Sequence, residues 1–122
     1  MKLADVQKIL QAEVLCGSEH LHRDTQVACG ADLMSDVLAF TKEKALLLTG
    51  LTNIQVVRTA DMSDLVGIVF VRGKRPGPEV IQLAESKGIP LLLSNYPMYE
   101  SCGALYRGGL PGCSEKVGAC EG

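Results

Sequence analysis

Short apolar runs alternate with polar segments along the chain and predict buried strands joined by helices. Three runs, residues 45–49, 68–71 and 91–93, are continuous, and each is followed within two positions by glycine or small polar residues. Such runs are typical of strands buried on both faces, and the intervals between them have room for a helix and two turns. The pattern predicts parallel strands with right-handed crossover helices.

Two further strands are predicted upstream, at residues 13–16 and 26–31, with a polar loop at residues 18–25 between them. Gly17 ends the first strand. The alternation of strands and helices indicates an α/β fold, a three-layer-like domain with a mainly parallel sheet and crossover helices. We expect this domain to span residues 1–107.

Apolar residues recur at helical spacing in two segments near the start of the chain. In the first, residues 3–11, they are Leu3, Val6, Ile9 and Leu10. In the second, which follows the strand at 26–31, they are Met34, Val37 and Leu38. We expect Asp32 or Ser35 to cap the second helix, because either side chain can accept a bond from a free backbone N–H.

The helix expected at residues 78–87 has signals at both ends. Pro78 suits its first turn, Gly88 suits the position just after its end, and Pro90 prevents it from continuing. A last short helix is expected at residues 96–106.

The segment at residues 53–60 has two interpretations. Its residues Ile54, Val56 and Val57 alone would also fit a strand. The need for a crossover between parallel strands, and Thr52 as an N-cap, favour a helix.

Residues 108–122 differ in composition from the rest. They hold five of the 13 glycines together with Pro111, and few apolar residues. We expect them to form a flexible tail that contains glycine and cysteine.

Several segments together resemble the DRTGG domain family over residues 1–106. They lie at residues 3–10, 30–35, 47–50, 83–90 and 94–99. The chain departs from the family pattern at two places. Leu51 and Thr52 stand where the family has an acidic and a basic residue, and Val71-Arg72-Gly73 stands for a Thr-Gly-Gly sequence.

The resemblance implies a non-catalytic and often dimeric regulatory domain. Such domains occur between paired CBS domains in regulated pyrophosphatases and attached to phosphotransacetylases, and they are similar to the N-terminal domain of HPr kinase. Stand-alone members accompany hydrogenase or other redox proteins. A homodimer and a redox or metabolic enzyme partner are therefore expected.

A candidate ligand site lies where the loops after the three apolar runs meet, because ligands of open parallel sheets bind beyond the carboxyl ends of the strands. Each loop precedes a helix N-terminus, which favours anions, and the middle loop adds three cations. We expect a small anion there, such as an adenine nucleotide; the alternative is that the glycines only turn the chain. The candidate residues are Thr49, Gly50, Thr52, Arg72, Gly73, Lys74, Arg75, Ser94, Asn95 and Tyr96.

The same loops argue against an enzyme. They contain no carboxylate, no histidine and no phosphate-binding loop with lysine, whereas phosphoryl transfer needs positioned charges and a metal-binding acid. Thr49 and Ser94 have no base nearby in sequence, so a serine-type nucleophile is disfavoured as well. We expect no catalytic residues.

Two groups of side chains are candidates for metal or redox chemistry. Cys16, His20, His22 and Cys29 have the donor atoms that zinc prefers, but without a Cys-x-x-Cys spacing, so core thiols and surface histidines are favoured.

Cys102, Cys113 and Cys120 form the second group. Their gaps of ten and six residues do not match an iron–sulfur signature. A redox accessory protein that holds a metal or cluster with these cysteines is the alternative function; inert tail thiols are favoured, and we expect no metal or cofactor.

Composition restricts the partners further. A net charge of −2 and 4% aromatic residues give no footprint for nucleic acid. No apolar run approaches the roughly 20 residues of a membrane span, and the early Asp5 does not fit a signal peptide, so a cytoplasmic protein is expected. Tyr96, Tyr99 and Tyr106 fall near one helical face and are expected to pack in the core or in a dimer.

Overall fold

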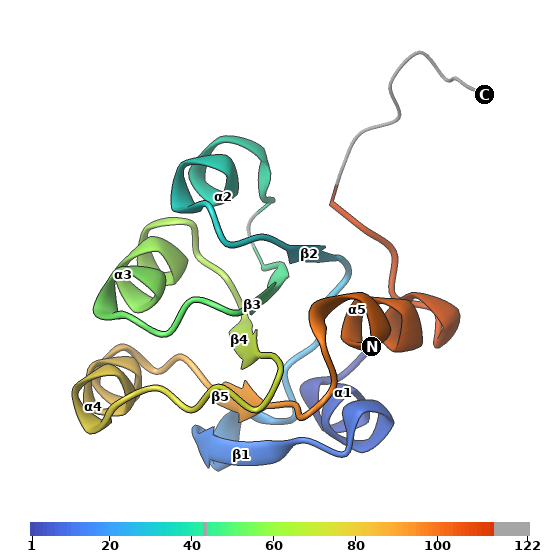
Figure 1. The fold of residues 1–122 in the computed structure, drawn as a ribbon, viewed down its shortest axis with the longest axis horizontal. Coiled ribbons are helices and arrows are strands. Elements are labelled where there is room, and N and C mark those ends of the chain that lie inside the picture. The colour runs from blue at the N-terminus through green and yellow to red at the C-terminus, as the bar shows by residue number, and fades with distance from the viewer. Residues whose placement is uncertain (43, 114–122) are drawn as a thin grey trace.

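The structure, a computed structural model, describes residues 1–42 and 44–113, which form one sheet and the helices around it (Figure 1). The strands are β1 (Glu13–Cys16), β2 (Ala28–Gly30), β3 (Leu46–Thr49), β4 (Gly67–Phe70) and β5 (Leu91–Leu93). The helices are α1 (Leu3–Leu10), α2 (Met34–Phe40), α3 (Ile54–Met62), α4 (Pro78–Lys87), α5 (Met98–Arg107) and the short 3-10 helix η1 (Ser18–His20).

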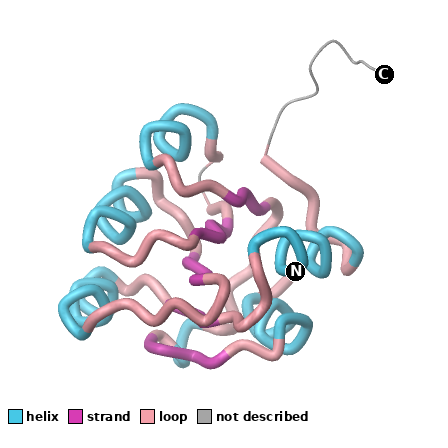
Figure 2. The backbone as a smooth tube through the Cα atoms, in the orientation of Figure 1, coloured by secondary structure: helices cyan, strands magenta, loops and turns pink. Residues whose placement is uncertain are grey.

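The five strands lie in the order β1-β5-β4-β3-β2. The pairs β2–β3, β3–β4 and β4–β5 are parallel, and helices connect them, as Figure 2 shows. β1 is the exception, because it pairs with β5 in the antiparallel direction at the edge of the sheet. The prediction of a mainly parallel sheet with crossover helices is confirmed.

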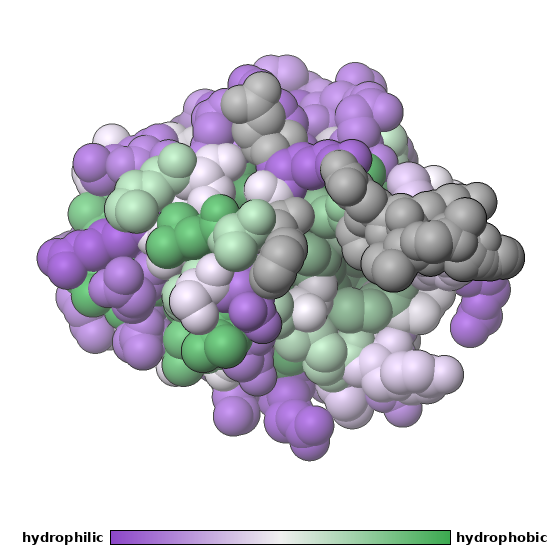
Figure 3. All heavy atoms as spheres, turned by 90° about the horizontal axis from the view of Figure 1, so that it is seen from above, coloured by the Kyte–Doolittle hydropathy of each residue, from purple (hydrophilic) through white to green (hydrophobic). Residues whose placement is uncertain are grey.

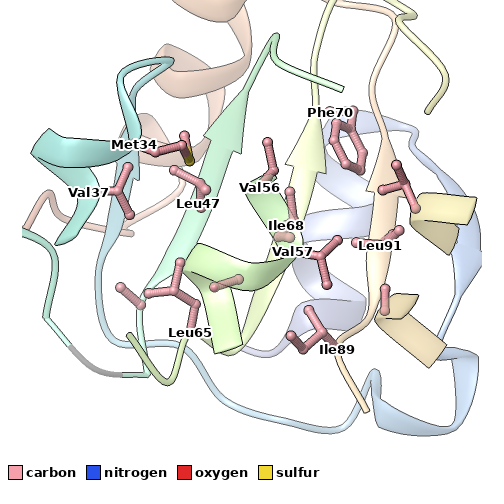
Figure 4. Packing of buried hydrophobic residues seen from close by; sticks show 14 of the residues in the cluster. Met34, Val37, Leu47, Val56, Val57, Leu65, Ile68, Phe70, Ile89 and Leu91 are labelled. Carbon is pink, nitrogen blue, oxygen red and sulfur yellow. The ribbon is translucent and has the colours of Figure 1, made fainter. Parts of the chain in front are cut away.

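Helices cover both faces of the sheet, which explains the continuous apolar runs. On one face, Leu47, Ile68 and Phe70 pack under α2, α3 and α4 (Figure 4). On the other face, Leu48 and Val69 belong to a second cluster with residues of α1 and α5. Neighbouring residues of one strand therefore enter opposite layers, and each fully buried side chain of this kind contributes about 1.5–3 kcal/mol.

The ends of the helices agree only in part with the sequence prediction. α4 begins with Pro78 at its first turn and ends at Gly88, whose φ of +68° is the left-handed conformation that glycine adopts easily. For α3 the predicted cap was wrong. Asn53 and not Thr52 is the N-cap, since the Asn53 side chain accepts a hydrogen bond from the Gln55 N–H at 3.0 Å.

The predicted cap of α2 was also wrong. Leu33 occupies the N-cap position without a side-chain bond, and Ser35 lies inside the helix. The Asp32 carboxylate bonds to a neighbouring loop instead. On the predicted apolar face, Met34 and Val37 are buried but Leu38 is 46% exposed.

The first residues after α5 differ from the expected tail. Leu110 and Cys113 are buried, and the segment bonds to β2 through the Ala28 N–H, which donates to the Pro111 carbonyl oxygen at 2.9 Å. Gly109, with a φ of +106°, turns the chain so that Leu110 joins the cluster with α1 and α5. The rest of the predicted tail, with Cys120, lies outside the described residues, where the tail stays a prediction.

No helix in the described part of the chain is long and apolar enough to cross a membrane.

Candidate functional site

Two of the three predicted loops are joined directly by backbone hydrogen bonds. β4 and β5 end side by side, and the loop after β4 donates to the loop after β5. The Arg72 N–H donates to the Tyr96 carbonyl oxygen, and the Gly73 N–H donates to that of Ser94, both at 2.8 Å. These backbone groups are therefore committed to the protein and not to a ligand.

The turn after β4 exposes its side chains through an unusual backbone conformation. Arg72 and Gly73 have φ values of +61° and +66°, and the Lys74 N–H closes the turn on the Val71 carbonyl oxygen at 3.2 Å. Positive φ at two successive residues suits glycine but strains arginine. The side chain of Arg72 is exposed at this position. Strained residues that the surrounding bonds hold in place cluster at functional sites.

Ser94 fastens the start of α5 to this turn. It is fully buried, and its Oγ lies 3.0 Å from the Oγ of Ser101 in α5. The same Ser94 Oγ accepts a bond from the Tyr96 N–H at 3.2 Å, and the Ser101 hydroxyl donates to the Tyr96 carbonyl oxygen at 3.2 Å. Ser94 is thus a structural link and not a free ligand group.

The three predicted loops contain no carboxylate of their own, but the strand next to the first loop brings one against it. Asp32, at the carboxyl end of β2, accepts bonds from the Thr49 hydroxyl at 3.0 Å and the Gly50 N–H at 2.8 Å. The Thr49 Oγ1 in turn accepts from the Leu51 N–H at 3.1 Å. The negative charge and the occupied donors disfavour an anion at Thr49 and Gly50. The position of Asp32 just after a predicted parallel strand was the signal that could have revealed it.

The three cations of the middle loop are not equivalent. Arg75 forms an ion pair with Glu13 of β1 at 2.6 Å between Nη2 and Oε1. Arg72 and Lys74 are exposed, and neither belongs to an ion pair within residues 1–42 and 44–113. The positive charge available to a ligand therefore comes from two side chains.

The exposed part of the candidate site is a shallow surface. A Cβ added at Gly73 would lie 3.0 Å from the Asn95 Oδ1, so Arg72, Gly73 and Asn95 are neighbours. Asn95 is exposed, and Tyr96 is 40% exposed. Thr52 is half-buried on the first loop, just before the N-cap of α3. Backbone hydrogen bonds join the second and third loops, whereas the donors of the first loop are bonded to Asp32.

Three hollows lie away from these loops. One of about 500 Å³ is at the opposite end of the sheet, near Arg23 and Lys87. The others, of about 610 and 380 Å³, flank β2. Figure 3 views the molecule from above the orientation of Figure 1 and shows apolar surface between more hydrophilic regions. The apolar lining of the 610 Å³ hollow includes Leu48, Leu105 and Leu110.

The candidate zinc ligands do not meet. Cys16 lies in β1 and Cys29 in β2, at opposite edges of the sheet. The Cys16 thiol donates to the Ile89 carbonyl oxygen at 3.6 Å, and His20 Nδ1 lies 2.9 Å from Nη2 of Arg23. Cys16 and Cys29 therefore cannot bind one ion together.

Of the later cysteines, Cys113 is placed differently from the prediction, and Cys102 lies in the predicted last helix. Cys113 is buried, because the segment that carries it packs against β2. Cys102 lies on α5 with its thiol 3.7 Å from the Met98 sulfur. Within residues 1–42 and 44–113, no three His, Cys, Asp or Glu side chains converge in a way that would hold a metal ion.

The tyrosines are not core residues, contrary to one of the two expectations for them. Tyr99 and Tyr106 of α5 are 86% and 71% exposed. Their rings lie on the outside of the helix, because Leu105 and Ser101 occupy its buried face. Packing in a dimer stays a prediction.

One solved structure with the same fold is the CBS and DRTGG domains of the regulatory region of Clostridium perfringens pyrophosphatase, complexed with the activator diadenosine tetraphosphate. The TM-score is 0.70 at 16% sequence identity, and the match covers 90% of this chain and 47% of that chain. The chain thus spans about half the length of that structure, and at this identity the likeness shows the fold alone.

The comparison with curated proteins found no match. The family model of the DRTGG domain matches residues 5–107, from within α1 to the end of α5. This span includes the whole five-stranded sheet. The chain therefore belongs to the DRTGG domain family, as its sequence motifs predict.

Proposed function

We propose that this domain is a non-catalytic regulatory module that binds a small anionic ligand at the surface of Arg72, Lys74, Asn95 and Tyr96. The observation that carries the proposal is Arg72, an exposed arginine in a left-handed conformation, whose turn donates backbone bonds to the neighbouring loop. Membership of the DRTGG family supports the regulatory role. The activator in the pyrophosphatase complex supports adenine nucleotides as the first ligands to test.

The side chains at this surface suit a nucleotide phosphate. A guanidinium binds phosphate oxygens through two parallel hydrogen bonds, and an ammonium adds a point charge. The half-exposed ring of Tyr96 offers a face for a base, and the Asn95 amide can donate and accept. The Asp32 carboxylate keeps the ligand away from the first loop, so the proposed site includes only the second and third of the predicted loops.

A bound ligand would act on α5 through bonds that already exist. The Arg72 N–H and the Ser101 hydroxyl donate to the same Tyr96 carbonyl oxygen. A shift of the turn after β4 therefore changes the start of α5, where Tyr99 is exposed for contact with a partner. We place the partner, a second copy of the chain or a metabolic enzyme, on this helix, and the complex in the cytoplasm.

Calorimetric titration of the full chain with ATP, diadenosine tetraphosphate and inorganic phosphate tests the site. The double variant Arg72→Ala/Lys74→Ala is expected to bind at least about tenfold more weakly than the wild type, since two charge-assisted contacts are lost. Arg75→Ala is the matched control, because its charge is already paired with Glu13. Wild-type affinity in the double variant would place the ligand elsewhere.

Salt and light scattering extend the test. Added salt is expected to weaken the binding of phosphate-containing ligands, because exposed charges are screened beyond about 8 Å at physiological ionic strength.

Size-exclusion chromatography with light scattering is expected to show a dimer that Tyr99→Glu/Tyr106→Glu dissociates. A wild type that stays monomeric at high concentration would exclude the dimer.

A further inference from the structure

The segment after α5 forms an additional short partner for β2. The Ala28 N–H donates to the Pro111 carbonyl oxygen at 2.9 Å, and the Cys113 N–H donates to the Ala28 carbonyl oxygen at 3.1 Å. These bonds form a parallel bridge between Ala28 and Gly112. Cys29 follows Ala28 in β2, and Cys113 follows Gly112 in the segment after α5. This parallel register places the two cysteines side by side at the edge of the sheet.

The two cysteine side chains also point to the same face of the sheet. Cys113 is 6% exposed and belongs to the cluster under α2, and Cys29 packs against this cluster. Both line the 380 Å³ hollow together with Val37 and Thr41. Cys102 packs against the cluster on the opposite face.

The placement of Cys113 beside Cys29 agrees with its effect on the pKa of the Cys29 thiol. Burial raises the pKa of the Cys29 thiol, the hydrogen bond with Thr41 lowers it, and the nearby Cys113 thiol raises it further. The Cys29 sulfur lies 3.2 Å from the Thr41 Oγ1, so this side chain is held in place.

We propose that Cys29 and Cys113 form a reversible disulfide that fastens the segment 110–113 to the edge of the sheet. Neighbouring strands lie about 4.8 Å apart, and a disulfide needs a Cα separation of about 4.4–6.8 Å. Two cysteines on adjacent strands, in register and on one face, meet this condition. The open hollow beside them gives a small oxidant access to the sulfur atoms.

Hydrogen peroxide is an oxidant of the right size, and the reaction balances. One cysteine, as thiolate, attacks a peroxide oxygen; an S–O bond forms, the O–O bond breaks, and the hydroxide takes a proton to leave as water. The second sulfur then attacks the sulfenic acid; the S–S bond forms, the S–O bond breaks, and a second water leaves. Two thiols thus lose two electrons and two protons to one peroxide. A dithiol reductant reverses the change by thiol–disulfide exchange.

Mass spectrometry can assign the bond without ambiguity, because trypsin places each of the five cysteines in a different peptide. The full chain is reduced, freed of reductant, treated with hydrogen peroxide, blocked with N-ethylmaleimide and digested. The expected product is peptide 24–42 linked to peptide 108–116, with a mass two hydrogens below the sum. A different cysteine pair, or complete alkylation after peroxide, would overturn the proposal.

Matched variants separate the disulfide from general oxidation. Cys29→Ala and Cys113→Ala are expected to abolish the linked peptide, whereas Cys102→Ala and Cys120→Ala retain it. The melting temperature of the wild type is expected to rise by about 5 °C or more on oxidation, because the bond closes a long loop of the unfolded chain. Circular dichroism checks that each variant is folded. Retention of the wild-type shift in Cys113→Ala would contradict the proposal even if a linked peptide were found.

Discussion

The carboxylate of Asp32 accepts a hydrogen bond from the backbone N–H of Gly50 at 2.8 Å, between two loops that are 18 residues apart in sequence. The same oxygen accepts from the Thr49 hydroxyl at 3.0 Å. In many α/β sheets this position is where a ligand phosphate would accept such bonds. Here a side chain of the protein already does so.

Replacing Asp32 by Asn is expected to separate its structural role from its charge. The amide oxygen still accepts, but the bonds lose their charge assistance, so the free energy of unfolding falls by about 1 kcal/mol in a urea titration. Removal of the negative charge is expected to increase phosphate affinity roughly two- to fivefold. Lower affinity in Asp32→Asn would contradict an anion site at this edge.

Arg72→Gly is expected to stabilise the fold and, at the same time, to weaken ligand binding. Glycine relieves the left-handed strain, worth about 1–2 kcal/mol, and part of this gain is lost to the greater freedom of the unfolded chain. A net gain of up to about 1 kcal/mol is expected in urea unfolding. Lys74→Gly is the control, since it removes a charge at a residue that does not have positive φ and is expected to destabilise.

Ser94 and Ser101 are expected to be energetically coupled. Each single change to alanine removes a buried hydroxyl and is expected to cost about 1–2 kcal/mol, since partners are left unpaired. The double variant is expected to cost about 1 kcal/mol less than the sum. Ser86→Ala, at an exposed hydroxyl, should change stability by less than about 0.5 kcal/mol. Strict additivity would argue against the direct bond.

Leu110→Ala tests whether the segment after α5 is part of the folded domain. Leu110 is 3% exposed, and its truncation is expected to cost about 2–4 kcal/mol of the free energy of unfolding. The same change at Leu38, which is 46% exposed, is expected to cost less than about 1 kcal/mol. Equal losses at the two positions would mean that the segment does not pack in solution.

Alkaline pH is expected to destabilise the reduced protein through its buried thiols. Burial raises the pKa of Cys16, Cys29 and Cys102 above the usual 9.0, in each case as the largest cause. Above pH 9 the unfolded chain releases these protons while the folded chain retains them, so stability present at pH 7–8 is lost as the pH rises through the raised values.

Urea unfolding with a phosphine reductant at pH 8, 9 and 10 measures this loss. The triple alanine variant of Cys16, Cys29 and Cys102 is expected to lose less stability over this range than the wild type. All other side chains are common to both proteins, so their contributions cancel in the comparison. Identical pH slopes would contradict a thiol origin.

Local patterns were enough to predict most of the fold. The runs at β3, β4 and β5 are apolar because both faces of these strands are buried, and α4 has Pro78 and Gly88 at its ends. The cap of α3 was misplaced by one residue because Thr52 and Asn53 are both good capping residues. Which of the two residues caps the helix depends on the course of the backbone after β3.

The candidate site was predicted less well because its contacts depend on strand order. The pairs Asp32–Gly50 and Arg75–Glu13 join residues 18 and 62 positions apart. The Arg75–Glu13 pair does not follow from spacing, since β1 could have joined either edge and in either direction. The Asp32–Gly50 pair requires that β2 and β3 are neighbours in the sheet. The burial of Leu110 likewise depends on a chain reversal at Gly109 that composition alone does not reveal.

The antiparallel pairing of β1 with β5 also sets an order of events during synthesis. Of the five described strands, the first to be made is paired with the last, Glu13 opposite Leu93, and α1 packs with α5. β2, β3 and β4 can begin to pair on a nascent chain, but β1 has to wait for residues 91–93 to leave the ribosome. Until then the apolar side of α1, with Leu3 and Val6, lacks the part of its core cluster that β5 and α5 supply. Synthesis that stops before β5 therefore produces a chain in which α1 is only partly covered and is open to chaperones and proteases.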